Sequence, residues 1–139
     1  MESRGIDNAR YWNGATGPSQ IARMESRLRV AKDMGEQVIL FCHYPVHPPH
    51  THNLWNDLEV VDVIGRHPCV RAYINGHQHR EAYALHHGVH YLTMKGMVET
   101  ENETAFSVIR IFNNRIEVEG FGREDNRVLH LGPGNPVIQ

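Results

Sequence analysis

Two histidines in the segment Gly76-His77-Gln78-His79 have the spacing to act as metal ligands. They follow the apolar run CVRAYIN (69–75) directly. Neutral imidazole is the commonest protein ligand for metal ions, and side chains at positions i and i+2 of an extended chain project to the same side. If the two rings diverge, each could bind a different ion of a pair about 3.5–4 Å apart. Taken alone, the motif is equally compatible with a surface turn that carries two solvated histidines.

A third histidine, His43, stands at the end of another apolar run, QVILFC (37–42). Short continuous apolar runs are typical of strands covered on both faces of a parallel sheet. Ligands of open α/β sheets bind outside the carboxyl ends of such strands. If the two runs form neighbouring strands, His43 therefore points to the same crevice as His77 and His79. The alternative is a histidine that only caps its strand through a loop carbonyl.

Other side chains are weaker candidates for a site. Asn56, beside Trp55, and His47, in the proline-rich segment after His43, could contact a substrate, although core packing and solvation explain them equally simply. We predict no catalytic residue beyond the metal ligands. Four charged side chains could bind a metal or a phosphate but are expected to be solvated: Glu99, Glu101, Arg123 and Arg127.

Helices are predicted on either side of the first apolar run. The first covers PSQIARMESRLRVAKDMG (18–35), with Thr16 as its N-cap and Gly35 as its stop. The second covers 54–65, because Leu54, Leu58, Val61 and Ile64 recur at helical spacing. After the second apolar run, two hairpins are predicted. One turns near His87-Gly88, and the other turns at Asn113-Asn114, which accepts the positive φ of a type I′ turn.

The element order α-β-α-β followed by antiparallel hairpins predicts an α/β fold in one domain. We expect an irregular lead-in over 1–15, a partial domain over 16–131 and a loose C-terminal tail over 132–139. The composition is globular, with 40% hydrophobic residues, and the formal charge of −2 offers no basic field for nucleic acid. Eleven histidines are the unusual feature, and they direct the search for function.

Location is predicted from what the sequence lacks and from its thiols. No apolar run approaches the roughly 18 residues of a membrane span, and the first residues lack the apolar region of a signal peptide. Cys42 and Cys69 both lie in apolar runs, as buried thiols in a reducing compartment would. We therefore expect a cytoplasmic protein without a membrane partner.

The two histidine segments resemble a known family. FCHYPVHP and NGHQH are similar to the last two metal motifs of the calcineurin-like metallophosphoesterases. The resemblance extends from Asn13 to Leu131 and is strongest to the C-terminal half of the manganese-dependent ADP-ribose/CDP-alcohol diphosphatase branch. The further segments that carry it are NGATGPSQIARMESRL, HNLWND, GRHPCVRAYINGHQH, GVHYLTMKGMVET and EGFGREDNRVL.

The resemblance implies a fold, a metal site and a reaction. The family fold is an αββα sandwich, of which this chain would be the C-terminal half. By resemblance, His43 and His77 bind the second of two divalent ions (Mn, Fe or Zn), and His79 reaches the first. The implied reaction is hydrolysis of a phosphodiester or of a nucleoside-diphosphate derivative by a metal-bridging hydroxide.

The family's upstream motifs D-x-H, G-D-x-x-D and G-N-H-[D/E] do not occur in this sequence. They supply the bridging aspartate and further ligands, so the chain alone is expected to be inactive and to need an N-terminal partner fragment. The alternative hypothesis is a non-catalytic oligomerising or interaction module that keeps a residual histidine metal site. Half of a sandwich would expose an apolar sheet face, which favours self-association.

Overall fold

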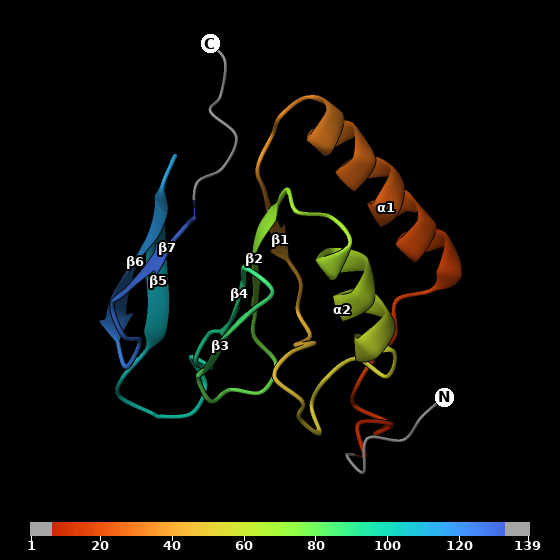
Figure 1. The fold of residues 1–139 in the computed structure, drawn as a ribbon. Coiled ribbons are helices and arrows are strands. Elements are labelled where there is room, and N and C mark those ends of the chain that lie inside the picture. Colours follow the sequence, from red (N-terminus) through yellow and green to blue (C-terminus); the bar gives the residue numbers. More distant parts are fainter. Residues whose placement is uncertain (1–6, 133–139) are drawn as a thin grey trace.

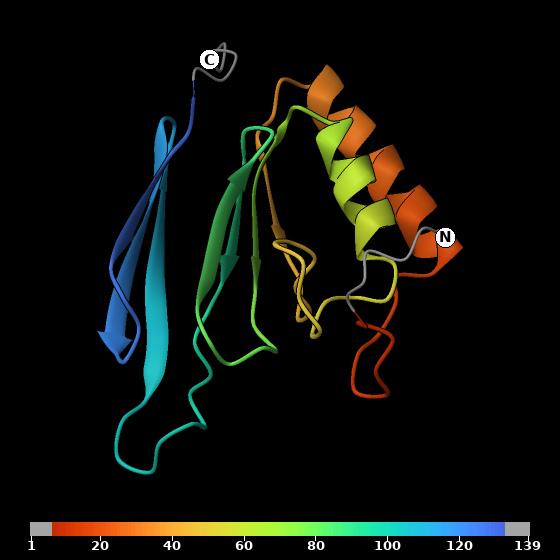
Figure 2. The ribbon, with the colours of Figure 1, turned by 60° about the horizontal axis from the view of Figure 1, so that its bottom comes forward.

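Helices, a four-stranded sheet and a three-stranded sheet form three stacked layers in the computed structural model, which describes residues 7–132 (Figures 1 and 2). The helices α1 (Pro18–Asp33) and α2 (Asp57–Gly65) cover one face of the larger sheet. The smaller sheet packs against the other face. The predicted α/β class with two stacked sheets is thus confirmed, while the predicted tail lies, except for Gly132, outside the described residues.

The larger sheet has the strand order β1-β2-β4-β3, in which β1, β2 and β4 are parallel and β3 is antiparallel to β4. Its strands are β1 (Val38–Phe41), β2 (Val70–Asn75), β3 (Ala82–His86) and β4 (Val89–Thr93). The expectation of full cover on both faces is correct for β2 but wrong for β1. Because β1 lies at the edge of the sheet, its residues are only partly covered, and Phe41 is 65% exposed.

The smaller sheet has the order β5-β6-β7 and is antiparallel throughout. Its strands are β5 (Ala105–Phe112), β6 (Arg115–Gly122) and β7 (Arg127–His130), of which β7 was not predicted. Both predicted hairpins are present. The positive φ values of a type I′ turn occur at His87 (50°) and Gly88 (78°), whereas the prediction of positive φ at Asn113-Asn114 is wrong.

The first helix begins one residue later than its predicted cap. Gly17 is the N-cap, and its backbone N–H donates to Gln20 Oε1 at 2.9 Å. Thr16 cannot serve because its backbone N–H and carbonyl are both bound by the Asn56 side chain, at 3.0 and 2.8 Å. The predicted stop is confirmed, since Gly35 takes the left-handed conformation (φ 71°) after the last turn.

The second helix begins at Asp57, three residues after its predicted start. Leu54 is buried in the turn that precedes it, so the predicted apolar stripe is wrong, and Leu58 is 46% exposed. The side chains that the helix buries in the core are Val60, Val63 and Ile64.

Two apolar cores hold the layers together. Because successive side chains of a strand point to opposite faces, Tyr73 of β2 packs under the helices while Ala72 and Ile74 face the smaller sheet. The core between the sheets also contains Leu92, Ile116, Val118, Leu129 and Leu131. The two cysteines are free and partly buried, not fully buried as expected. No helix among the described residues is long and apolar enough to cross a membrane.

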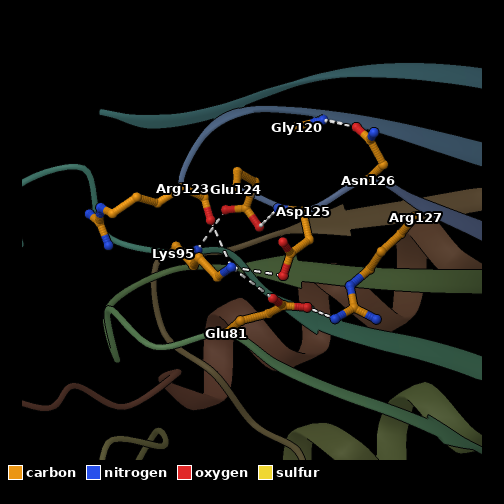
Figure 3. Close-up of polar contacts among 8 residues, drawn as sticks. All are labelled: Glu81, Lys95, Gly120, Arg123, Glu124, Asp125, Asn126 and Arg127. Atoms are coloured by element: carbon orange, nitrogen blue, oxygen red, sulfur yellow. Dashed lines mark hydrogen bonds and ion pairs between the residues drawn. The ribbon is translucent and has the colours of Figure 1, made fainter. Parts of the chain in front are cut away.

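A polar network joins the two sheets beside the segment that follows β4 (Figure 3). Lys95 Nζ donates to the Arg123 carbonyl at 2.7 Å and to Asp125 at 2.8 Å, and it lies 3.3 Å from Glu81. Glu81 also pairs with Arg127. Two arginines considered as phosphate ligands, Arg123 and Arg127, are therefore engaged in contacts between the sheets.

His67, which follows α2, predicts a pH dependence of stability. Its ring is buried (8% exposed), and burial lowers the pKa of His67 below 6.5. Nearby charges have smaller effects, Glu25 raising the pKa and Arg66, Arg29 and Lys32 lowering it. The unfolded chain therefore binds the proton more readily, so stability is kept above pH 6.5 and lost as the pH falls from there toward the lowered pKa.

We expect His67→Gln to weaken this loss. The measurement is the urea midpoint at several pH values between about 5 and 8, over which an ordinary histidine titrates. The exposed His130→Gln is the control and should leave the wild-type pH dependence intact. A His67→Gln curve that is parallel to that of the wild type would contradict the prediction.

Candidate functional site

His43 and His77 meet at the carboxyl ends of β1 and β2. The two strands are adjacent and parallel, and the chain segments that follow them leave the sheet at the same end (Figure 2). The Gly76 N–H donates to the His43 carbonyl at 3.1 Å, which extends the pairing one step beyond the strands. As a result His43 Nε2 lies 3.1 Å from His77 Nδ1. The predicted convergence of histidines from separate strand ends is present for this pair.

Asn13 contacts the other face of this pair, and the sequence argument missed it. His77 Nε2 lies 3.0 Å from Asn13 Oδ1, and the Asn13 side chain is buried. The residue belongs to a lead-in that was predicted to be irregular, so no periodic pattern marked it. Its only signal was its place at the start of the segment NGATGPSQ, one of those that carry the family resemblance.

The surroundings keep His77 neutral. Burial is the largest cause of a pKa of His77 below its ordinary value, and nearby His43, His52 and His79 lower it further. A metal ligand must be unprotonated, so a histidine with a lowered pKa offers its lone pair over a wider pH range. Burial and the neighbouring His52 likewise lower the pKa of His50.

His79 lies apart from the pair. Its Nδ1 is 2.5 Å from Glu99 Oε1, and both side chains are about half exposed. His79 and His77 line the same shallow pocket, of about 440 Å³, whose other walls include Trp12, His52, Arg80 and Glu99. Between residues 7 and 132, no three His, Cys, Asp or Glu side chains are grouped closely enough to hold one ion. The site thus consists of a histidine pair and a neighbouring histidine–carboxylate pair.

Both histidines of the motif have a backbone conformation that side chains rarely adopt. The φ angle is 68° at His77 and 62° at His79. A residue with a Cβ atom loses stability in this region, and such residues cluster at functional sites. The conformation turns the two imidazoles into the pocket, which an ordinary extended exit from β2 would not do.

Asn56 and His47, the proposed substrate contacts, do not line the pocket. Asn56 holds the Thr16 backbone and donates to Glu59 at 2.7 Å. His47 stacks on His86 with 4.5 Å between ring centroids. Substrate contact by either residue stays a prediction. Glu101, the other acidic candidate, is exposed.

Gly96 leaves room for His79. Its N–H donates to the His79 carbonyl at 3.0 Å, and a Cβ atom on Gly96 would lie 2.7 Å from His79 Cγ. The Gly96 carbonyl is held by Arg123 at 2.5 Å, beside the network of Figure 3, so the imidazole must move rather than the loop.

We expect Gly96→Ala to displace the imidazole and lower the affinity for Mn²⁺ about 10–100-fold, the usual effect of disturbing the support of a ligand. Gly76→Ala is the matched control, since a Cβ there meets nothing within 4 Å. Calorimetric Mn²⁺ titrations of both variants, with their urea midpoints, make the comparison. Equal affinities would show that His79 does not contribute to binding.

Comparisons with known proteins agree with this geometry. No family model matches the chain. The manganese-dependent ADP-ribose/CDP-alcohol diphosphatase of Xenopus tropicalis is 33% identical over 133 residues, which cover 91% of this chain and 39% of that protein. The enzyme of the same name from Arabidopsis thaliana is 29% identical, covering 81% and 38%. The chain spans about two fifths of the length of the curated relatives it matches.

A solved structure gives the same result for the fold. The crystal structure of a dimetal phosphatase from Danio rerio superposes with a TM-score of 0.79 at 26% identity, covering 84% of this chain and 38% of that one. The resemblance noted in the sequence is therefore confirmed: over most of its length this chain is a relative of the manganese-dependent ADP-ribose/CDP-alcohol diphosphatases, and it has the fold of the matching part of a dimetal phosphatase.

Proposed function

We propose that this chain forms part of a divalent-metal phosphoesterase, in which His43 and His77 bind one ion and His79 contributes to a second. The observation that carries the proposal is the 3.1 Å separation of His43 Nε2 and His77 Nδ1. Two nitrogen atoms at about 2.0–2.1 Å from one ion have a similar separation when they occupy neighbouring coordination positions. The donor set therefore fits a divalent ion as part of its ligand shell.

Two neighbouring dications need anionic ligands, and this chain supplies few. Glu99, at His79, is the carboxylate closest to the proposed second ion. The remaining carboxylates are proposed to come from an N-terminal partner fragment, because the relatives that the chain matches are more than twice its length.

The proposed substrate is a nucleoside-diphosphate derivative. The relatives are named for ADP-ribose and CDP-alcohol, and both compounds have phosphoanhydride or phosphodiester groups. When bound, the ions would neutralise charge on the phosphoryl oxygens and activate water for attack on phosphorus. Arg80 adds positive charge to the wall of the pocket, which favours an anionic ligand. We further propose a cytoplasmic location, consistent with the two free thiols.

Metal analysis after dialysis tests the proposal. The wild-type chain, equilibrated with Mn²⁺, should retain metal that His43→Ala/His79→Ala loses. The control His87→Ala/His130→Ala also removes two imidazoles, and His87, with φ 50°, matches the left-handed conformation of His79, with φ 62°.

Equal metal content in the two double variants would remove the site. That result would favour the alternative, an interaction module, for which the exposed apolar residues of the smaller sheet are the supporting observation. These residues include Phe106, Val108, Phe121 and Val128.

A further inference from the structure

We infer that Asn13 is a positioning residue that selects the tautomer of His77 and so directs His77 Nδ1 toward the ion. This inference rests on the proposed function for its consequence, but the tautomer itself is a property of the metal-free chain. No sequence pattern marks Asn13, and its role follows from its hydrogen bonds.

The orientation of the Asn13 amide is fixed by two carbonyl groups. Asn13 Nδ2 donates to the Asn8 carbonyl at 2.8 Å and to the Thr51 carbonyl at 2.7 Å. A carbonyl oxygen can only accept, so the NH₂ group of Asn13 must face these two atoms. The amide therefore presents Oδ1, an acceptor, to His77 Nε2 at 3.0 Å.

An acceptor at this position leaves His77 one choice of tautomer. Nε2 must bear the hydrogen, and in the neutral ring Nδ1 then keeps its lone pair. That lone pair faces His43 Nε2 across 3.1 Å, the place assigned to the ion. The opposite tautomer would put a hydrogen on Nδ1 and leave two acceptors facing each other at Asn13.

The lead-in is held in place for this contact. Asn8 Nδ2 donates to the Leu54 carbonyl at 2.6 Å, and Trp55 Nε1 donates to the Arg10 carbonyl at 2.9 Å. Asn13 itself is only 5% exposed. A buried amide whose hydrogen-bonding groups are matched in this way costs stability when replaced by a hydrocarbon of similar shape.

Nitrogen NMR of the histidine rings tests the inference in metal-free, ¹⁵N-labelled chain at alkaline pH, where the imidazoles are neutral. The wild type should show His77 almost entirely as the Nε2–H tautomer. Asn13→Leu, which has no acceptor, should show a substantial Nδ1–H population, and its Mn²⁺ affinity should fall about 10–100-fold, as when other outer partners of ligating histidines are lost. Asn13→Asp keeps an oxygen acceptor and should keep the Nε2–H tautomer.

Trp55→Phe is the matched control, because it removes a different hydrogen bond of the lead-in and leaves the Asn13 amide in place. It should not change the tautomer. A wild-type chain with His77 mainly as Nδ1–H overturns the inference without any variant, so a poorly folded Asn13→Leu does not block the test. An unchanged tautomer in folded Asn13→Leu also overturns it. Loss of Mn²⁺ binding in His43→Ala/His79→Ala is a separate result, so the inference and the proposed function can fail independently.

Discussion

Replacing His77 with alanine is expected to reduce phosphoester hydrolysis to the background rate when the chain is complemented. The complementing polypeptide would carry the three upstream metal motifs and be supplied with Mn²⁺. His77 is the central residue of the site, since its ring contacts both His43 and Asn13. Its loss leaves His43 as a single imidazole, which holds an ion weakly. The measurement is the rate of ADP-ribose hydrolysis by the assembled pair.

His87→Ala is the control for this experiment. His87 has φ 50°, close to the 68° of His77, so both variants place alanine in the left-handed region and carry a similar backbone cost. His87 lies in the turn between β3 and β4, at the other end of the larger sheet from the histidine pair. If complemented His77→Ala hydrolyses ADP-ribose as fast as complemented His87→Ala, the proposed role of His77 is wrong.

The sequence predicts the parts of the site that follow buried strands. The apolar runs before His43 and His77 indicated two parallel strands, and adjacent parallel strands bring their carboxyl ends together. The pairing of His43 with His77 is therefore a consequence of a local pattern. The order of the larger sheet was less accessible, because the hairpin that ends in β4 returns to pair with β2, a contact that no local spacing records.

The remaining contacts of the site depend on long-range packing. Asn13 reaches His77 across 64 positions of sequence, and Glu99 reaches His79 across 20. Neither residue lies on an element with a hydrophobic period. The left-handed φ angles of His77 and His79 are equally hidden, because histidine has no intrinsic preference strong enough to predict them. The edge position of β1 also required the topology, since its sequence matches that of a covered strand.

Ile116→Ala is expected to lower the free energy of unfolding by about 2–5 kcal/mol, the usual cost of removing a large aliphatic side chain from a core. Ile116 lies on β6, is fully buried, and belongs to the core that joins the two sheets with Ile74 and Leu92. The surrounding strands are tied by their hydrogen-bond ladders and cannot collapse into the space that alanine leaves. Urea unfolding of the purified chain measures the effect.

Ile111→Ala provides a control within the same hairpin. Ile111 is the cross-strand neighbour of Ile116 on β5, but it is 62% exposed. Its truncation should therefore cost well under half as much, since little of its surface is removed from water on folding. Equal losses for the two variants would mean that the smaller sheet does not pack against the larger one in solution. In that event β2 would lack cover on one face, and the strand end that carries His77 would have no rigid support.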